Sequence, residues 1–152
     1  DTKAYALKAE CQSSISDVNF SVGGSVYSHD RFWMGGGTIG IGLSNFTLLG
    51  ELDVTHNYVM GLPAVDSSNP GGNMMAVHAE AGYMTMQGLW LMVMFDAFDP
   101  IQGVEENEIK RLTLGVEFFP YSFVELRPQY RLNIETPSVS NDQMLVQMHL
   151  WF

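Results

Sequence analysis

The last ten residues of the chain, Gln143-Met144-Leu145-Val146-Gln147-Met148-His149-Leu150-Trp151-Phe152, alternate between two kinds of side chain. The even-numbered positions are all apolar, whereas the odd positions include the polar Gln143, Gln147 and His149. Successive side chains of a β-strand point to opposite faces, so a period of two predicts a strand with one apolar face.

The same alternation recurs along the whole chain and predicts an all-β, antiparallel protein. No segment shows a helical period or a helix cap of any length. Tight turns are expected at 12–16, 44–45, 86–88 and 120–121, and loops at 28–31, 60–72, 100–108 and 137–141. A single β-domain over residues 1–152 is predicted, with strands at about 3–11, 17–28, 32–43, 46–58, 74–85, 88–99, 109–119, 122–136 and 142–152.

The length of these strands indicates which face of the sheet meets water. They are roughly 9–13 residues long, longer than the roughly 5–6 of soluble sheets and close to the 9–11 that cross a bilayer at a tilt. Alternation alone also fits a soluble, lipocalin-like barrel with its apolar side inward. The strand lengths and the aromatic residues Trp33, Tyr83, Tyr121 and Tyr130 favour a membrane barrel with its apolar side toward lipid.

Three segments carry a resemblance to a known class. The terminal strand Gln143–Phe152, the hairpin from Gly115 to Arg131 and the strand from Gly88 to Pro100 resemble the closing strands of bacterial porin-like outer-membrane β-barrel proteins. The terminal strand, which ends in Phe, is the most specific of the three. The resemblance implies a bacterial outer membrane as location, contact with outer-membrane lipid and, often, passage of solutes. It also implies insertion by the barrel-assembly machinery, with Phe152, Leu150 and Met148 as assembly signal.

The predicted number of strands is odd, and this leaves two interpretations. Bacterial single-chain barrels have an even number of strands and both termini in the periplasm. Either residues 1–11 form no strand and the barrel has eight, or the chain is the C-terminal eight to nine strands of a larger up-and-down transmembrane barrel. The alternation from Tyr5 to Cys11 favours the second interpretation. Within the sheet, Pro128 predicts a bulge.

Composition and motifs exclude several functions. The formal net charge of −10 argues against nucleic acid. The single cysteine, Cys11, allows neither an internal disulfide nor a cysteine zinc site. Gly35 to Gly40 match a dinucleotide fingerprint, but a predicted strand continues where that fold needs a helix. The pair His78 and Glu80 lacks the cysteines of a zinc deaminase.

The positions of the histidines and serines along the chain indicate neither a catalytic centre nor a metal site. His56, His78 and His149 have no ligand spacing, and His78 shares a predicted face with Ser21 and Ser25 without any argument that brings them together. We therefore expect no cofactor, no metal and no enzymatic activity; an outer-membrane lipase is the least favoured of three functions.

Charged side chains follow the polar register of the predicted strands and suggest the function. The favoured interpretation is a porin-like channel for ions or small solutes, and the alternative is a structural barrel that sheaths or anchors a partner protein. Glu117 and Arg127 are predicted to form a pair worth about 0–1 kcal/mol in wet surroundings. The residues predicted to line the lumen are Glu51, Asp53, His78, Glu80, Asp96, Arg111, Glu117, Glu125, Arg127, Arg131 and Glu135.

Overall fold

The computed structural model describes residues 3–58, 72–102, 107–135 and 137–152. Its nine strands pair antiparallel with their neighbours in sequence and form one sheet in the order β1 to β9. This confirms the all-β, up-and-down prediction. The strands are β1 (Ala4–Ile15), β2 (Val18–His29), β3 (Phe32–Leu43), β4 (Phe46–Tyr58), β5 (Gly72–Met86), β6 (Leu89–Asp99), β7 (Ile109–Tyr121), β8 (Val124–Glu135) and β9 (Gln143–Leu150).

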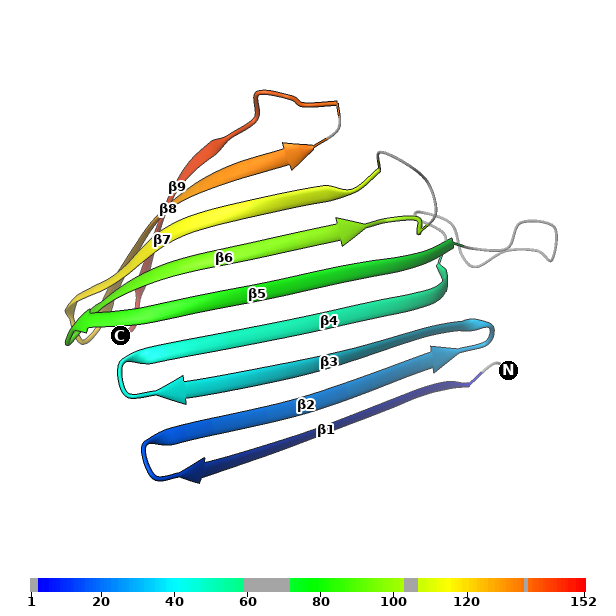
Figure 1. Cartoon of the computed structure of the whole chain (residues 1–152), viewed down its shortest axis with the longest axis horizontal. Coiled ribbons are helices and arrows are strands. Elements are labelled where there is room, and N and C mark those ends of the chain that lie inside the picture. The colour runs from blue at the N-terminus through cyan, green and yellow to red at the C-terminus, as the bar shows by residue number, and fades with distance from the viewer. Residues whose placement is uncertain (1–2, 59–71, 103–106, 136) are drawn as a thin grey trace.

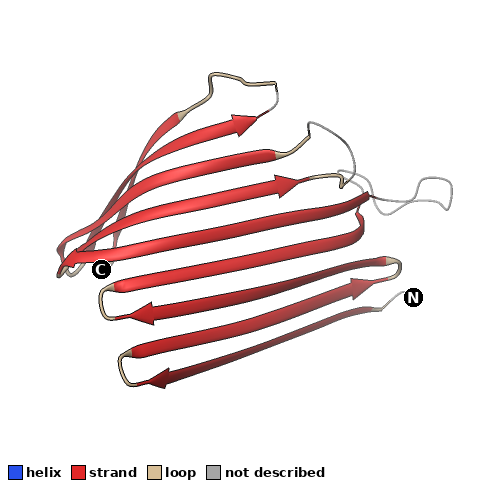
Figure 2. Cartoon of the chain, in the orientation of Figure 1, coloured by secondary structure: helices blue, strands red, loops and turns tan. Residues whose placement is uncertain are grey.

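The sheet is curved and open. In Figure 1, β8 and β9 bend behind β6 and β7, and β1 lies at the opposite edge. β1 pairs only with β2 and β9 only with β8, so the described strands do not close into a barrel. Figure 2 shows the described residues as strands joined by loops and turns. The described residues include no helix long and apolar enough to cross a membrane.

β1 is longer than its sequence suggests. The polar stretch after Cys11 predicts a turn at 12–16, but the strand continues to Ile15, which pairs with Val18. Across the ladder, Ser14 Oγ donates to Asn19 Oδ1 at 2.7 Å, so polar side chains find cross-strand partners without leaving the strand. Residues 4–11 therefore belong to the sheet, which excludes the interpretation in which they form no strand.

Short connections join most hairpins. Ser16, Asp30 and Ser44 each begin a two-residue turn with φ of 56°, 56° and 52°, the left-handed backbone that tight hairpins require. The predicted loop at 28–31 is thus a tight turn at Asp30. At Gly88, φ is +80° and a Cβ would lie 3.2 Å from the Phe119 carbonyl oxygen, so glycine is strongly favoured there.

The predicted bulge at Pro128 is wrong. The pairs Gly115↔Gln129 and Phe118↔Leu126 share one register, so no residue is inserted opposite Pro128. Proline lacks an N–H and simply leaves a gap in the hydrogen-bond ladder. The register shifts instead between Phe118 and Tyr121. β7 includes residues 120–121, where the sequence predicts a turn, and ends at Tyr121.

The two faces of the sheet differ in composition and in burial. The polar face, which carries Glu51, His78 and Arg127, holds the most buried polar side chains: Thr55 (4% exposed), Thr113 (2%), Glu125 (4%) and Gln129 (6%). The apolar face carries exposed hydrophobic residues such as Leu91 (46%), Val93 (46%), Leu114 (46%), Met144 (78%) and Val146 (63%). This order of burial is the reverse of that in a soluble domain.

Candidate functional site: the polar face of the sheet

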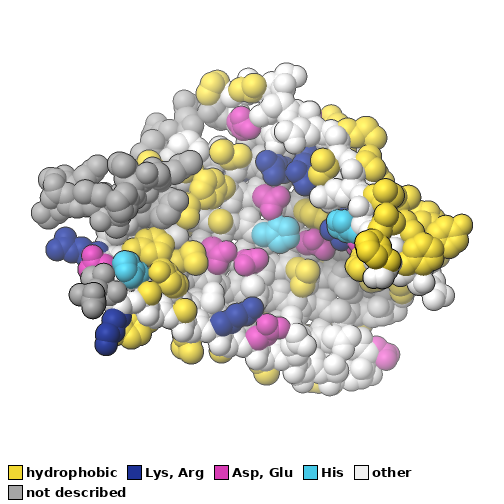
Figure 3. All heavy atoms as spheres, turned by 180° about the vertical axis from the view of Figure 1, so that it is seen from behind, with side chains coloured by type: hydrophobic (Ala, Val, Ile, Leu, Met, Phe, Trp, Pro, Cys, Tyr) yellow, Lys and Arg dark blue, Asp and Glu magenta, His cyan; other side chains and the backbone are white. Residues whose placement is uncertain are grey.

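Directly paired residues form continuous rows across the polar face. All residues predicted to line a lumen share this face, and in Figure 3 charged side chains gather near its middle. That they line a lumen stays a prediction. One row runs from β3 to β8 through Thr38, Glu51, His78, Asp96, Arg111 and Asn133.

Strands β4 to β6 contribute an acidic cluster. His78 Nδ1 lies 2.8 Å from Asp96 Oδ1, and His78 Nε2 lies 3.9 Å from Glu80 Oε2. Glu51 stands directly opposite His78, and the Asp53 carboxylate lies over Gly36, where a Cβ would collide with it. No group of three or more His, Cys, Asp or Glu side chains suited to a metal ion occurs among the described residues. The cluster therefore supplies negative charge to the face.

Strands β7 to β9 contribute an ionic network near the short turns. Arg127 Nη2 donates to Glu117 Oε1 at 2.5 Å, so the predicted pair is present. Arg127 Nε also lies 2.9 Å from Glu125 Oε1, which makes an ion pair. The geometry of this contact is not that of a hydrogen bond. His149 Nδ1 lies 2.9 Å from Glu125 Oε2. The network thus extends beyond the predicted pair to Glu125, whose side chain is only 6% exposed.

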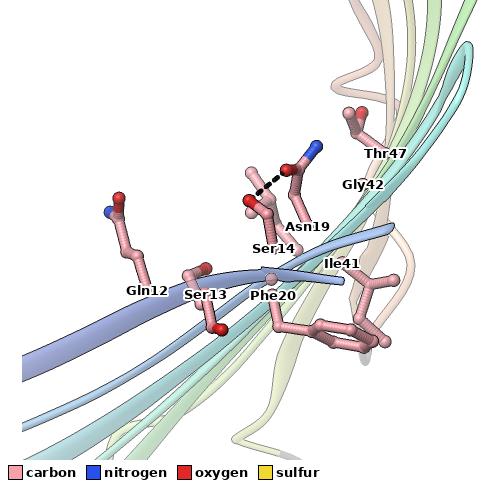
Figure 4. A pocket seen from close by; sticks show the side chains of 11 residues that line it. Gln12, Ser13, Ser14, Asn19, Phe20, Ile41, Gly42 and Thr47 are labelled. Carbon is pink, nitrogen blue, oxygen red and sulfur yellow. Dashed lines mark hydrogen bonds between the residues drawn. The ribbon is translucent and has the colours of Figure 1, made fainter. Parts of the chain in front are cut away.

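Strands β1 to β4 contribute an uncharged hollow. A hollow of about 580 Å³ lies beside Ser14, Asn19 and Thr47, close to the short turns (Figure 4). Its lining offers hydroxyl and amide groups but no charge. The uncharged hollow therefore lies near the short turns of β1 to β4, whereas the charged pair Lys8 and Glu10 lies further along β1 on the same face.

The other sequence candidates lie apart from these clusters. His56 is on the apolar face, where its ring stacks on Trp33 with centroids 6.0 Å apart. His78 is separated from Ser21 and Ser25 by β3 and β4, so the three residues form no catalytic arrangement. The glycines at 35–40 lie within β3, and the next element is another strand.

The residues of the proposed assembly signal are exposed. Met148 is 61% exposed and Leu150 is 52% exposed, both on the edge strand β9, and Phe152 extends beyond it with a relative exposure of 118%. Their role in assembly stays a prediction.

Neither a protein-family model nor a curated protein nor a solved structure matches this chain.

Proposed function

We propose that this chain forms part of a porin-like β-barrel of the bacterial outer membrane that passes ions or small solutes. The observation that carries the proposal is the reversed burial: Glu125 and Gln129 are packed on the polar face, while Val93 and Leu114 are exposed on the other. A bilayer is the solvent in which an exposed apolar face is stable and a polar face turns inward.

The apolar face has the height of a bilayer core. Between its rims this face carries no Asp, Glu, Lys, Arg or His in the described strands; His56, Asp99 and Lys110 all lie at the end of the longer loops. From Phe46 to His56, β4 spans about 33 Å, which a tilt of about 40° reduces to about 25 Å. That height supports contact with outer-membrane lipid.

Aromatic side chains border this belt. Trp33 lies beside His56 at one end, and at the other end Phe46 and Tyr83 have ring centroids 5.7 Å apart. Tyr121 and Phe123 stack at 5.7 Å at the same end. Aromatic rings prefer the interface between lipid and water, so these groups support two interfacial girdles.

The open edges support a larger barrel. Every residue of β1 is exposed, and a long unpaired edge without proline invites pairing with another strand. Nine alternating strands make β1 and β9 run in the same direction, so a fully antiparallel closure requires an odd number of further strands. We propose that such strands complete a barrel with an even total, inserted by the barrel-assembly machinery.

The charges of the polar face predict a preference for cations. Reversal potentials in a salt gradient should show cation selectivity in the parent protein, and Glu51→Lys should weaken it, because Glu51 has no ion-pair partner among the described residues. In the described strands the face carries eight acidic and four basic residues: Glu10, Glu51, Asp53, Glu80, Asp96, Glu117, Glu125 and Glu135 against Lys8, Arg111, Arg127 and Arg131.

The matched control for this measurement is Asp17→Lys, which makes the same charge change in the turn between β1 and β2. It should leave the reversal potential unchanged. Anion selectivity in the parent, or equal behaviour of the two variants, would show that the polar face does not line the conducting path.

One observation favours the alternative, a barrel that sheaths a partner protein. The polar face is partly apolar where Met84 of β5 pairs with Trp90 of β6, and where Met92 and Met94 follow Trp90 on the same face of β6. Methionine and tryptophan adapt to protein surfaces and are common at interfaces. Absence of conductance in planar bilayers, together with a stoichiometric partner protein in the purified material, would favour the sheath over the channel.

A further inference from the structure

Two arginines on the polar face, Arg111 and Arg131, have no carboxylate partner among the residues that the structure describes. Arg111 Nε donates to Asn133 Oδ1 at 3.0 Å, and Arg131 Nη2 donates to Gln129 Oε1 at 3.3 Å. Both acceptors are neutral amides. The third arginine of this face, Arg127, contacts two carboxylates, so within the described part of the chain Arg111 and Arg131 differ from it.

The nearby carboxylates are held elsewhere. Asp96 stands directly opposite Arg111 in the ladder, yet its Oδ1 lies 2.8 Å from His78 Nδ1, and the two residues form no ion pair. Glu135, further along β8, accepts a hydrogen bond of 2.7 Å from Asn141 Nδ2. Among the described residues, no carboxylate forms an ion pair with either arginine, so both guanidinium groups can bind an anionic ligand.

The register places the two arginines close together on adjacent strands. Arg111 pairs with Asn133, and Arg131 pairs with Thr113, so the arginines are diagonal neighbours on adjacent strands. Diagonal positions are close enough for long side chains to meet. A guanidinium has five N–H donors, and each arginine uses one in the hydrogen bonds above, so most donors stay available.

We propose that Arg111 and Arg131 together bind an oxyanion group, a carboxylate or a phosphate, of a solute at the channel wall. The planar fork of arginine matches both groups, and two forks hold one oxyanion better than one. Half-burial of both arginines raises the strength of such contacts above that at a fully wetted surface. The inference rests on the proposed channel for its physiological meaning, but not for its test.

The test is calorimetric titration of the purified protein in detergent micelles, with sodium succinate and sodium phosphate as separate probes at fixed ionic strength. Binding of one probe or both is expected and identifies the source of the oxyanion. Arg111→Gln and Arg131→Gln should each raise the Kd about tenfold, as expected for loss of one charge-assisted contact. Arg131→Lys should fall between, because it keeps the charge and loses the fork.

Lys8→Gln is the control, since it removes one positive charge from the polar face at β1, where Lys8 Nζ lies 3.9 Å from Glu10. It should leave the Kd within about twofold, because the exposed charge is distant and screened. Heat-modifiable mobility in a gel verifies that each variant is folded. Binding of neither probe, or equal effects of Lys8→Gln and Arg131→Gln, would overturn the oxyanion site.

Because the titration needs no conduction, the two proposals fail separately. Oxyanion binding without conductance would support the oxyanion site and contradict the proposed channel. Conductance without oxyanion binding would support the channel and contradict the oxyanion site.

Discussion

Val93→Arg should block assembly of the barrel in a membrane, whereas Met94→Arg should be tolerated. Val93 lies in the middle of the apolar face and is 46% exposed, so an arginine there would point into lipid at a cost of about 2–4 kcal/mol. Met94 is the next residue, on the polar face, where it pairs directly with Glu80. An arginine at 94 would gain that carboxylate as a partner.

Heat-modifiable mobility in a gel measures the folded fraction of the two variants in membranes. We expect at least a tenfold lower folded fraction for Val93→Arg than for Met94→Arg, since about 1.4 kcal/mol corresponds to each factor of ten. The opposite order would place the apolar face inside a soluble barrel.

Arg127→Met should have the largest effect on stability among the charged residues. Its removal leaves the Glu117 and Glu125 side chains, 18% and 6% exposed, without the cation that separates them. Losing one partner of a buried ionic group costs about 3 kcal/mol or more. The urea midpoint of unfolding, followed by tryptophan fluorescence in detergent micelles, should fall accordingly.

Arg131→Met is the matched control on the same strand and face. Because Arg131 has no carboxylate partner among the described residues, its loss should cost less than about 1 kcal/mol. Adding Glu125→Gln to Arg127→Met should recover part of the stability, because it removes one of the two repelling charges. Equal losses in Arg127→Met and Arg131→Met would show that the network contributes nothing specific.

Alternation of side chains was enough to predict most of the fold. It located the strands, separated the two faces and placed Glu117 beside Arg127, because a hairpin with a short turn fixes its own register. It misjudged the end of β1, since polar residues such as Gln12 and Ser14 resemble a turn but are also stable on an exposed edge strand.

The ion-pair partners of individual residues could not be predicted from the sequence. Asp96 has both His78 and Arg111 as direct cross-strand neighbours, and only the side-chain conformation shows that it contacts His78. His149 joins Glu125 from 24 residues away, which requires the register of two strands separated by a loop. The alternation of side chains predicts on which face a residue lies. Which charged side chain it contacts depends on how the side chains of neighbouring strands pack.

The orientation of the sheet relative to lipid is tested most directly by spin labels at Glu51, Leu52, Asp53 and Val54 of β4, in a Cys11→Ser background in liposomes. Collision rates with oxygen, which concentrates in lipid, and with a water-soluble nickel chelate should alternate along the strand. We expect high oxygen access at Leu52 and Val54 and high nickel access at Glu51 and Asp53. The reverse pattern, or equal access at all four positions, would contradict a lipid-facing apolar side.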